Sequence, residues 1–231
     1  MKKLKTLIEQ NRHWAQDITK KDPNLFARLT KHQQPQYLWI GCSDSRVPAS
    51  QILGLLPGDL FVHRNIANMV IHSDLSCLAV LQYAVDVLKV RDIIVCGHYD
   101  CGGIKAAMTN TSYGLIDNWL RHIQDIEQKH HNVLSYCSGK AQQNDLEQND
   151  LSQKQHALMC ELNAIEQAIN LTRTSFVQDA WNKGISLAVH AVIYSVSTGL
   201  LKQLAFAIES SQQIKDFYAQ ALDDIRNNNK A

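Results

Sequence analysis

Two short segments of the sequence concentrate side chains that can bind a metal ion or move a proton. In the first, GCSDSRVPA, Cys42, Asp44 and Arg46 place a thiol, a carboxylate and a permanent cation at alternate positions. In the second, GHYDCGG, His98 and Cys101 add an imidazole and another thiol. Thiolate sulfur and imidazole nitrogen are the protein ligands that zinc prefers. The two segments therefore indicate metal chemistry.

Each segment directly follows an apolar run that is typical of a buried strand. Residues 37–41 (YLWIG) precede the first, and residues 92–96 (DIIVC) precede the second. In open α/β sheets the carboxyl ends of the strands form the crevice in which ligands bind. If the two strands are neighbours, Cys42, His98 and Cys101 converge at that edge.

Three protein ligands leave a fourth position of a tetrahedral zinc ion open for water, which is the catalytic pattern. An H-x2-C pair alone is a weak signal, but it gains weight beside a C-x-D-x-R segment after a second strand. Each residue also has an ordinary structural interpretation. Cys42 alone is typical of a buried apolar position, His98 of a loop histidine, and Asp44 with Arg46 of a local ion pair. Cys77 and Cys96 lie within apolar patterns and are predicted to be core residues.

The rest of the chain predicts helices alternating with strands. Such alternation favours parallel pairing with right-handed crossovers, and thus one α/β domain over residues 1–231. The polar stretch 138–154 is interpreted as an exposed loop or a helix extension. The other predicted elements are helices over 3–19, from the pair Asp22-Pro23 to Leu29, over 74–90 with Ser73 as its cap, and over 115–126, and strands over 60–62 and 187–196.

Composition excludes several classes of function. The 231 residues are 45% hydrophobic and 19% charged, with a net charge of +1, which gives no electrostatic case for binding nucleic acid or an anionic membrane. No run approaches the length of apolar sequence that a transmembrane helix needs. The N-terminal sequence MKKLKTLIEQNRHW lacks the apolar core of a signal peptide. Six cysteines without such a signal favour reduced thiols and a cytoplasmic location.

The motifs CSDSR and GHYDCGG, with PGDLFVHRNIAN between them, resemble those of the β-class carbonic anhydrases. The resemblance covers most of residues 1–135 and resumes around 155–196. It implies a zinc enzyme that interconverts carbon dioxide and bicarbonate. It also implies a mainly parallel sheet, about four parallel strands with an antiparallel edge strand, in a homodimer that often pairs into a homotetramer. The family's zinc ligands, for one Zn²⁺ per subunit, fall on Cys42, His98 and Cys101, and its acid–arginine dyad falls on Asp44 and Arg46.

The chemistry expected of these groups follows from general principles. Zinc lowers the pKa of a bound water towards ~7, which yields a hydroxide nucleophile at neutral pH. Two thiolates offset the charge of the ion, so an additional group that orients the hydroxide is useful. Asp44 can accept the hydroxide proton while Arg46 holds Asp44 off the metal through a bidentate pair. Asp44 can instead bind the metal as a fourth ligand, which fills the site and inactivates it.

One subgroup of the family is regulated by bicarbonate at a second site, built of a tryptophan, an arginine and a tyrosine. The matching positions in this chain are Trp39, Arg64 and Tyr194. We hypothesise that bicarbonate there stabilises the state in which Asp44 binds zinc. Tyr194 also fits an ordinary strand tyrosine with a hydrated hydroxyl group.

The resemblance further implies a small apolar pocket for carbon dioxide. Its residues would be Phe61, Ile66 and Tyr83, with Gly102 beside the metal loop and Gln33 donating a hydrogen bond near a dimer interface. Each of the three apolar residues is equally compatible with an ordinary core position.

Three segments stand apart from the family pattern or from a single-sheet core. Residues 1–34 form a predicted helical arm that packs on a partner subunit. Residues 137–153 are a polar insertion, and residues 200–231 match the pattern poorly, so the position of the last strand is open.

Other functions remain possible at this stage. A hydrolase of carbon disulfide or carbonyl sulfide could use the same site, and a non-catalytic zinc or redox protein could use the same ligands. A nucleotide-binding module is disfavoured because no G-x-G-x-x-G follows a strand and no G-x4-G-K-[ST] occurs.

Overall fold

The computed structural model describes residues 3–109, 111–138 and 145–228, apart from the side chains of 136–150. The chain divides into two compact units, Met1–Gln34 and Pro35–Ala231, and each is described by itself.

The smaller unit consists of two helices, α1 (Leu4–Lys21) and α2 (Leu25–Leu29), both as predicted. Asn24 rather than Asp22 is the N-cap of α2. The Asp22 carboxylate instead accepts a hydrogen bond from the Asn24 N–H and pairs with Arg28. Trp14 contacts Phe26 edge to face, with ring centroids 6.1 Å apart. Within this unit, the apolar residues of α1 remain largely exposed, Leu4 at 71%.

The larger unit is built on a five-stranded sheet in the order β2-β1-β3-β4-β5. The first four strands are parallel and β5 is antiparallel to β4, so the predicted architecture is confirmed. Because β1 lies between β2 and β3, strand order reverses there, and ligand crevices of α/β sheets open at such a point. The strands are β1 (Tyr37–Cys42), β2 (Leu60–Asn65), β3 (Asp92–His98), β4 (Ala188–Tyr194) and β5 (Leu201–Gln203).

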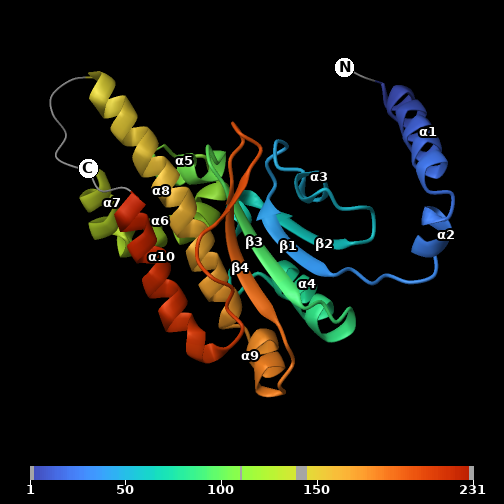
Figure 1. Cartoon of the computed structure of the whole chain (residues 1–231). Helices are drawn as coiled ribbons and strands as arrows, with labels where there is room; N and C mark the ends of the chain where they lie inside the picture. Colours follow the sequence, from blue (N-terminus) through green and yellow to red (C-terminus); the bar gives the residue numbers. More distant parts are fainter. Residues whose placement is uncertain (1–2, 110, 139–144, 229–231) are drawn as a thin grey trace. The chain divides into compact units, whose positions relative to one another are not determined.

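Alternation of side chains along the strands gives the sheet two buried faces. On one face, Leu38, Ile40 and Val95 join the main core, to which helix α8 (Asp145–Thr172) contributes. Figure 1 shows α8 along β3 and β4, with α10 (Ile214–Asn228) beside it. On the other face, Trp39 and Cys96 join a smaller cluster with residues that follow β1. Near-continuous apolar strands such as DIIVC are what a sheet covered on both faces requires.

The remaining helical segments connect the strands, and one predicted boundary changes. The segment predicted as one helix over 74–90 is α4 followed by a π-helical turn, η2. Its N-cap is Asp74 rather than Ser73, and the Asp74 carboxylate accepts hydrogen bonds from the N–H groups of Ser76 and Cys77. The segments are α3 (Ala49–Leu53), η1 (Ile66–Asn68), α4 (Leu75–Gln82), η2 (Tyr83–Val87), α5 (Gly102–Ala107), α6 (Ile116–Lys129), α7 (His131–Ser138), α9 (Ser175–Asn182) and η3 (Ser211–Gln213).

The two segments that depart from the expected pattern are partly ordered into elements of this fold. α8 begins at Asp145, so the later part of the polar stretch extends a helix, whereas residues 139–144 lie outside the described residues. Residues 200–228 supply the antiparallel edge strand β5 and the helix α10, and residues 229–231 lie outside the description.

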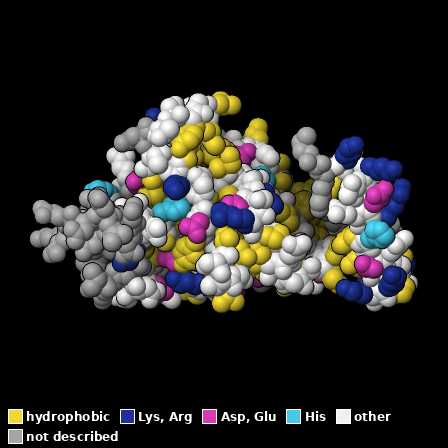
Figure 2. Space-filling model, turned by 90° about the horizontal axis from the view of Figure 1, so that it is seen from above, with side chains coloured by type: hydrophobic (Ala, Val, Ile, Leu, Met, Phe, Trp, Pro, Cys, Tyr) yellow, Lys and Arg dark blue, Asp and Glu magenta, His cyan; other side chains and the backbone are white. Residues whose placement is uncertain are grey.

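The surface is mixed in charge, in keeping with the net charge of +1. Figure 2 shows basic, acidic and histidine side chains interspersed with hydrophobic ones on the face in view. Within residues 3–109, 111–138 and 145–228, no helix combines the length and apolarity needed to cross a membrane.

Candidate metal centre

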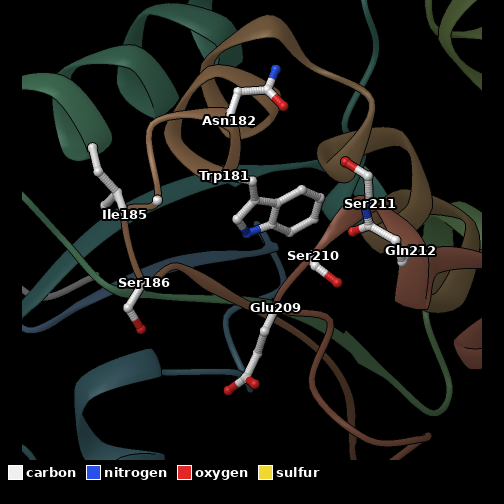
Figure 3. A pocket seen from close by; sticks show the side chains of 9 residues that line it. Trp181, Asn182, Ile185, Ser186, Glu209, Ser210, Ser211 and Gln212 are labelled. Carbon is white, nitrogen blue, oxygen red and sulfur yellow. The ribbon is translucent and has the colours of Figure 1, made fainter.

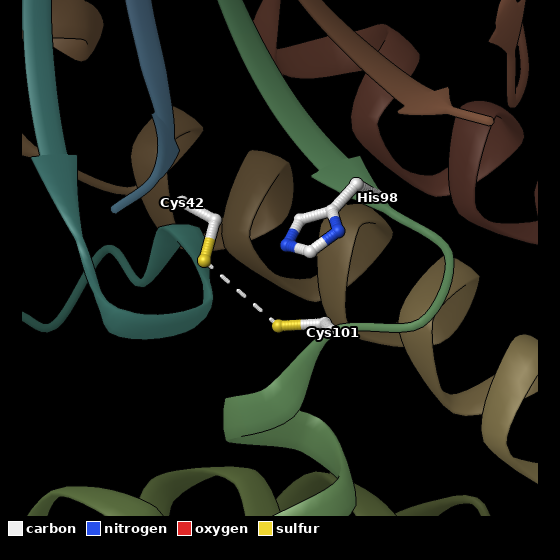
Figure 4. Close-up of side chains that lie close together, drawn as sticks. All are labelled: Cys42, His98 and Cys101. Atoms are coloured by element: carbon white, nitrogen blue, oxygen red, sulfur yellow. Dashed lines mark hydrogen bonds between the residues drawn. The ribbon is translucent and has the colours of Figure 1, made fainter. Parts of the chain in front are cut away.

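The three predicted metal ligands converge at the carboxyl edge of the sheet. Cys42 is the last residue of β1, His98 is the last residue of β3, and Cys101 is the N-cap of α5. All three are buried, and one potential ligand atom from each lies within 4.8 Å of the others. Figure 4 shows the imidazole and the two thiols directed toward a common space. Neighbouring parallel strands thus bring together residues that are 59 positions apart in the chain.

The hydrogen bonds of His98 leave one ring nitrogen available to a cation. Nδ1 lies 2.9 Å from the carbonyl oxygen of Tyr99, so this nitrogen carries the hydrogen and donates it. Nε2 is buried and has no hydrogen-bond partner among the described residues. A buried polar atom without a partner is costly, and a carbonyl acceptor on the opposite nitrogen is the usual arrangement of a metal-bound histidine. The imidazole therefore fits a metal ion at Nε2.

The two thiols form a hydrogen-bonded pair in which one of them ionises readily while the other keeps its proton. Their sulfur atoms are 3.9 Å apart, and both cysteines are free of disulfide bonds. The hydrogen bond from Cys101 lowers the pKa of Cys42 to about 4, whereas that same bond, together with burial, raises the pKa of Cys101. A cation bound between them would take the place of the shared proton. Two thiolates and one neutral imidazole suit zinc.

The predicted dyad is formed next to these ligands. Arg46 donates from Nε to Asp44 Oδ1 at 3.0 Å and from Nη2 to Oδ2 at 2.8 Å, a bidentate pair. This pair holds the pKa of Asp44 at about 2, so the carboxylate is ionised at neutral pH. Asp44 Oδ2 lies 3.8 Å from His98 Nε2, which places it beside the metal ligands. Arg46 also donates to the carbonyl oxygen of Asp100 at 3.0 Å and so ties the two loops together.

Trp39, Arg64 and Tyr194 project from one face of the sheet. Arg64 lies opposite Gly41, and it donates from Nε to Cys42 O at 2.8 Å and from Nη2 to Asp44 O at 2.5 Å. Trp39 is fully buried, and its Nε1 has no hydrogen-bond partner in the described part of the chain. Tyr194 packs against the cluster that contains Trp39.

The predicted substrate residues belong to several different elements of the fold. Phe61 and Tyr83 contact each other, with ring centroids 5.9 Å apart. Ile66, 38% exposed, packs so closely on Gly103 that a Cβ there would lie 2.7 Å from its Cγ2. Gly102 starts α5 immediately after Cys101. Gln33 belongs to the smaller unit, and its role in the site stays a prediction.

Sequence reasoning missed the residues that hold the second metal loop. The Tyr99 hydroxyl donates to Glu161 at 2.5 Å, and Lys202 bonds the same carboxylate oxygen at 3.0 Å. His156 Nε2 lies 3.0 Å from the carbonyl oxygen of Cys101. These partners are between 41 and 62 positions away from each other in sequence, and no local motif connects them.

Two of the open hollows in the described residues lie away from the three ligands. One of 390 Å³ surrounds Trp181 before the start of β4, at the sheet edge opposite the metal residues (Figure 3). The other, of 450 Å³, is lined by segments of α6 and α8, including Lys129 and Glu166. Neither is lined by Cys42, His98 or Cys101.

Comparison with known proteins places this arrangement in a family. The family model described as carbonic anhydrase matches residues 37–201, which span β1 to β5 and all three metal-ligand candidates. The chain belongs to the β-class carbonic anhydrases. It is 42% identical over 198 residues to a carbonic anhydrase of Emericella nidulans, covering 86% of this chain and 82% of that protein.

Solved β-carbonic anhydrase structures agree with the fold. The Coccomyxa β-carbonic anhydrase in complex with acetazolamide matches with a TM-score of 0.86 and 33% identity, over 97% of this chain and 96% of that one. A β-carbonic anhydrase of Aspergillus fumigatus matches with a TM-score of 0.75 and 35% identity over 100% of both chains. Members of this family are zinc enzymes, and the Cys–His–Cys cluster of this chain fits that ion.

Proposed function

We propose that the protein catalyses the reversible hydration of carbon dioxide to bicarbonate and a proton. The observation that supports this most directly is the buried trio Cys42, His98 and Cys101. Within the described residues, His98 Nε2 has no hydrogen-bond partner and lies beside two thiols that form no disulfide. When bound by these residues, zinc acts as a Lewis acid that lowers the pKa of a water ligand towards neutrality and makes it nucleophilic.

Asp44 and Arg46 orient the attacking water in this proposal. The carboxylate is ionised and next to His98, so Oδ2 can accept a hydrogen bond from a water at the metal centre. Because Arg46 occupies both carboxylate oxygens, it holds Asp44 in this orientation and away from direct metal ligation. Release of that pair would free the carboxylate to enter the metal site as a fourth ligand, which is the gate that we propose.

Stopped-flow measurement of carbon dioxide hydration on the zinc-loaded protein, from about pH 6.5 to about 9, tests the assignment. We expect activity in the wild type and its loss in Cys42→Ser, which lacks one ligand. Cys77→Ser is the matched control, because Cys77 is a buried thiol on α4 away from the trio. No hydration at any pH in the metal-loaded wild type would refute the proposal, and faster turnover of carbonyl sulfide or carbon disulfide would favour the hydrolase alternative.

We further propose that bicarbonate binds between Trp39, Arg64 and Tyr194 and inhibits the enzyme. The buried indole N–H of Trp39 has no acceptor among the residues that the structure describes, and an anion would supply one. Arg64 bonds the backbone of Cys42 and Asp44, so an anion that recruits this guanidinium would loosen the loop that holds Asp44.

Bicarbonate inhibition of hydration, measured across pH, tests this second site. We expect Trp39→Phe and Arg64→Ala to reduce the inhibition, whereas Arg91→Ala, which removes an equal charge at an exposed position before β3, should leave it intact. Unchanged inhibition in both site variants would rule out the site.

Self-association and cytoplasmic location complete the proposal. We propose that α1 packs on a partner subunit in a homodimer or homotetramer. We also propose that Phe61, Ile66 and Tyr83 line the substrate pocket, with Gln33 donating a hydrogen bond near the dimer interface. The exposed apolar stripe of α1 and the 44% exposure of Tyr83 support this. The related β-carbonic anhydrases of Sordaria macrospora are described as tetrameric. Light scattering on the full chain measures the state of assembly, and a monomer at all concentrations would contradict the interface.

The five buried free thiols of the described part suit a reducing compartment, which supports the proposed cytoplasmic location.

A further inference from the structure

The turn that follows β2 has an unusual backbone. Ala67 and Asn68 have φ angles of 64° and 48°, the left-handed region that residues with a Cβ seldom adopt. Both residues are buried, at 0% and 1% exposure. A conformation of this kind persists only where its surroundings enforce it, and it clusters at functional sites.

Side chains, rather than neighbouring backbone, satisfy the peptide groups of this turn. Asn65 bonds both the N–H and the carbonyl of Met69, each at 2.7 Å. Trp119 Nε1 donates to the Ile66 carbonyl at 2.9 Å. The turn is therefore fixed from both of its ends.

Helix α8 supplies the rest of the support from three polar residues on one face. Asn163 Nδ2 donates to the Ala67 carbonyl at 2.9 Å. Gln167 Oε1 accepts from the Val70 N–H at 2.7 Å, and Asn170 Nδ2 donates to the Val70 carbonyl at 3.2 Å. The positions i, i+4 and i+7 lie along the same face of a helix.

Gln167 also determines which way the Asn163 amide points. Its Nε2 donates to Asn163 Oδ1 at 3.0 Å, which leaves Asn163 Nδ2 to face the turn. Both side chains are buried, Asn163 at 1% and Gln167 at 0% exposure. The orientation of Asn163 follows from this network, because the reversed amide would set two donors against each other.

Ala67 is linked to the metal centre through its own N–H group. Its N–H points at Cys42 Sγ, with nitrogen and sulfur 3.4 Å apart. Asn163 thus anchors the carbonyl of the residue whose N–H reaches a metal-ligand sulfur. Hydrogen bonds to a thiolate withdraw electron density from sulfur and are one of the means by which a protein adjusts a metal centre.

We propose that Asn163, oriented by Gln167, is a positioning residue for the metal centre, holding the Ala67 N–H on the sulfur of Cys42. The proposal rests on the assignment of Cys42 as a zinc ligand under the proposed function. The Asn163 amide bonds Ala67 and Gln167, and its effect on Cys42 passes through the Ala67 N–H.

Cobalt substitution gives a test that does not depend on turnover. The thiolate-to-metal charge-transfer band of the Co²⁺-loaded protein reports electron density on sulfur. Without the N–H donor, sulfur becomes more electron-rich, so Asn163→Leu should shift the band to longer wavelength. A chelator competition with Zn²⁺ should show roughly tenfold weaker binding.

The matched control is Asn170→Leu, because Asn170 lies on the same face of α8 but bonds the Val70 carbonyl rather than Ala67. Asn170 also donates to Gln167 Oε1 at 3.3 Å, but the Val70 N–H holds that oxygen at 2.7 Å, so Gln167 keeps its orientation without Asn170. It should leave the band in place even if it lowers stability. Asn163→Ser, which is too short to reach Ala67, provides a second variant should the leucine interfere with folding, and its band should shift in the same direction.

The outcomes separate this inference from the proposed function. A band in Asn163→Leu or Asn163→Ser that coincides with the wild-type band overturns the positioning role, whatever the activity. An equal shift in Asn170→Leu also overturns it, because the effect would then come from general loosening of the turn. A selective shift in a protein without hydration activity would support the positioning role and refute the proposed function instead.

Discussion

A buried carboxylate in the larger unit, Glu166 on α8, allows a quantitative test of how the last helix is held. Tyr218 of α10 donates to Glu166 Oε1 at 2.5 Å, His130 Nε2 lies 2.6 Å from the same oxygen, and Lys129 Nζ lies 2.8 Å from Oε2. The carboxylate therefore joins α6, the His130 turn and α10 to α8. The Glu166 side chain is 5% exposed, and its bond to His130 is buried, whereas Lys129 reaches it from a half-exposed position.

The magnitude follows from the pKa of Glu166. Burial by itself would raise this pKa, but the bonds from His130, Lys129 and Tyr218 lower it from the ordinary 4.5 to about 2. At 1.36 kcal/mol for each tenfold change, the ionised carboxylate contributes about 3 kcal/mol to the free energy of unfolding at neutral pH. Because the folded pKa lies below the unfolded one, this contribution is complete above the unfolded pKa and is lost as pH falls through the folded pKa. At about pH 3, roughly 1 kcal/mol remains.

Glu166→Gln removes the charge while keeping the shape of the side chain. Urea unfolding followed by circular dichroism, at one protein concentration because subunits associate, should give a free energy of unfolding about 3 kcal/mol below that of the wild type at pH 7. The difference should shrink to roughly 1 kcal/mol at about pH 3. Asp223→Asn, on α10 but 64% exposed, should change little at either pH. A deficit in Glu166→Gln that stays the same from neutral to acid pH would refute the reasoning.

Three further predictions concern the metal centre and the sheet. A zinc chelator should abolish hydration and added zinc should restore it, because Cys42 and its partner ligands hold the ion; activity in protein shown to be metal-free would contradict this. Gly41→Ala should displace the Trp39 indole, because a Cβ there would overlap Nε1. An unmoved Trp39 indole resonance in ¹H–¹⁵N spectra would show otherwise. Gly97→Ala should lower the free energy of unfolding by about 1–3 kcal/mol, because its Cβ would lie 3.1 Å from Ala164 Cβ where β3 packs on α8. An unchanged unfolding midpoint of Gly97→Ala in a urea titration would contradict this prediction.

The convergence of Cys42, His98 and Cys101 could be predicted because local sequence encodes it. Each ligand segment follows a strand whose apolar run is continuous. Because the carboxyl ends of neighbouring parallel strands lie at one edge of the sheet, these patterns alone predict that Cys42 and His98 lie close together. The same reasoning gave the parallel sheet. Two predicted N-caps are wrong, because Asn24 rather than Asp22 caps α2 and Asp74 rather than Ser73 caps α4.

The supports of the centre could not be predicted, because they depend on contacts between distant segments. Ala67 is an unremarkable residue in sequence, and only its backbone conformation brings its N–H to Cys42. The two asparagines and the glutamine that support this turn lie in the α8 segment ELNAIEQAINL, whose polar residues look like a solvent-facing stripe. Asn163 and Gln167 are instead buried against the turn after β2.

Helix α8 supports the loops at the carboxyl edge of the sheet, where the candidate metal ligands lie. Loops that leave the carboxyl ends of parallel strands lose the ladder of backbone hydrogen bonds, yet a metal site requires its ligands to be held closely. In this chain the support comes from one rigid helix: His156 bonds the carbonyl of Cys101, Glu161 bonds the Tyr99 hydroxyl, and Asn163 bonds the carbonyl of Ala67. The residues at 156 and 163 are two turns apart and so lie on the same side of α8. Because one helix contacts both the loop after β2 and the loop after β3, a shift of α8 along its axis would move the surroundings of both thiols together. We therefore expect substitutions that loosen α8 to weaken metal binding even where they touch no ligand.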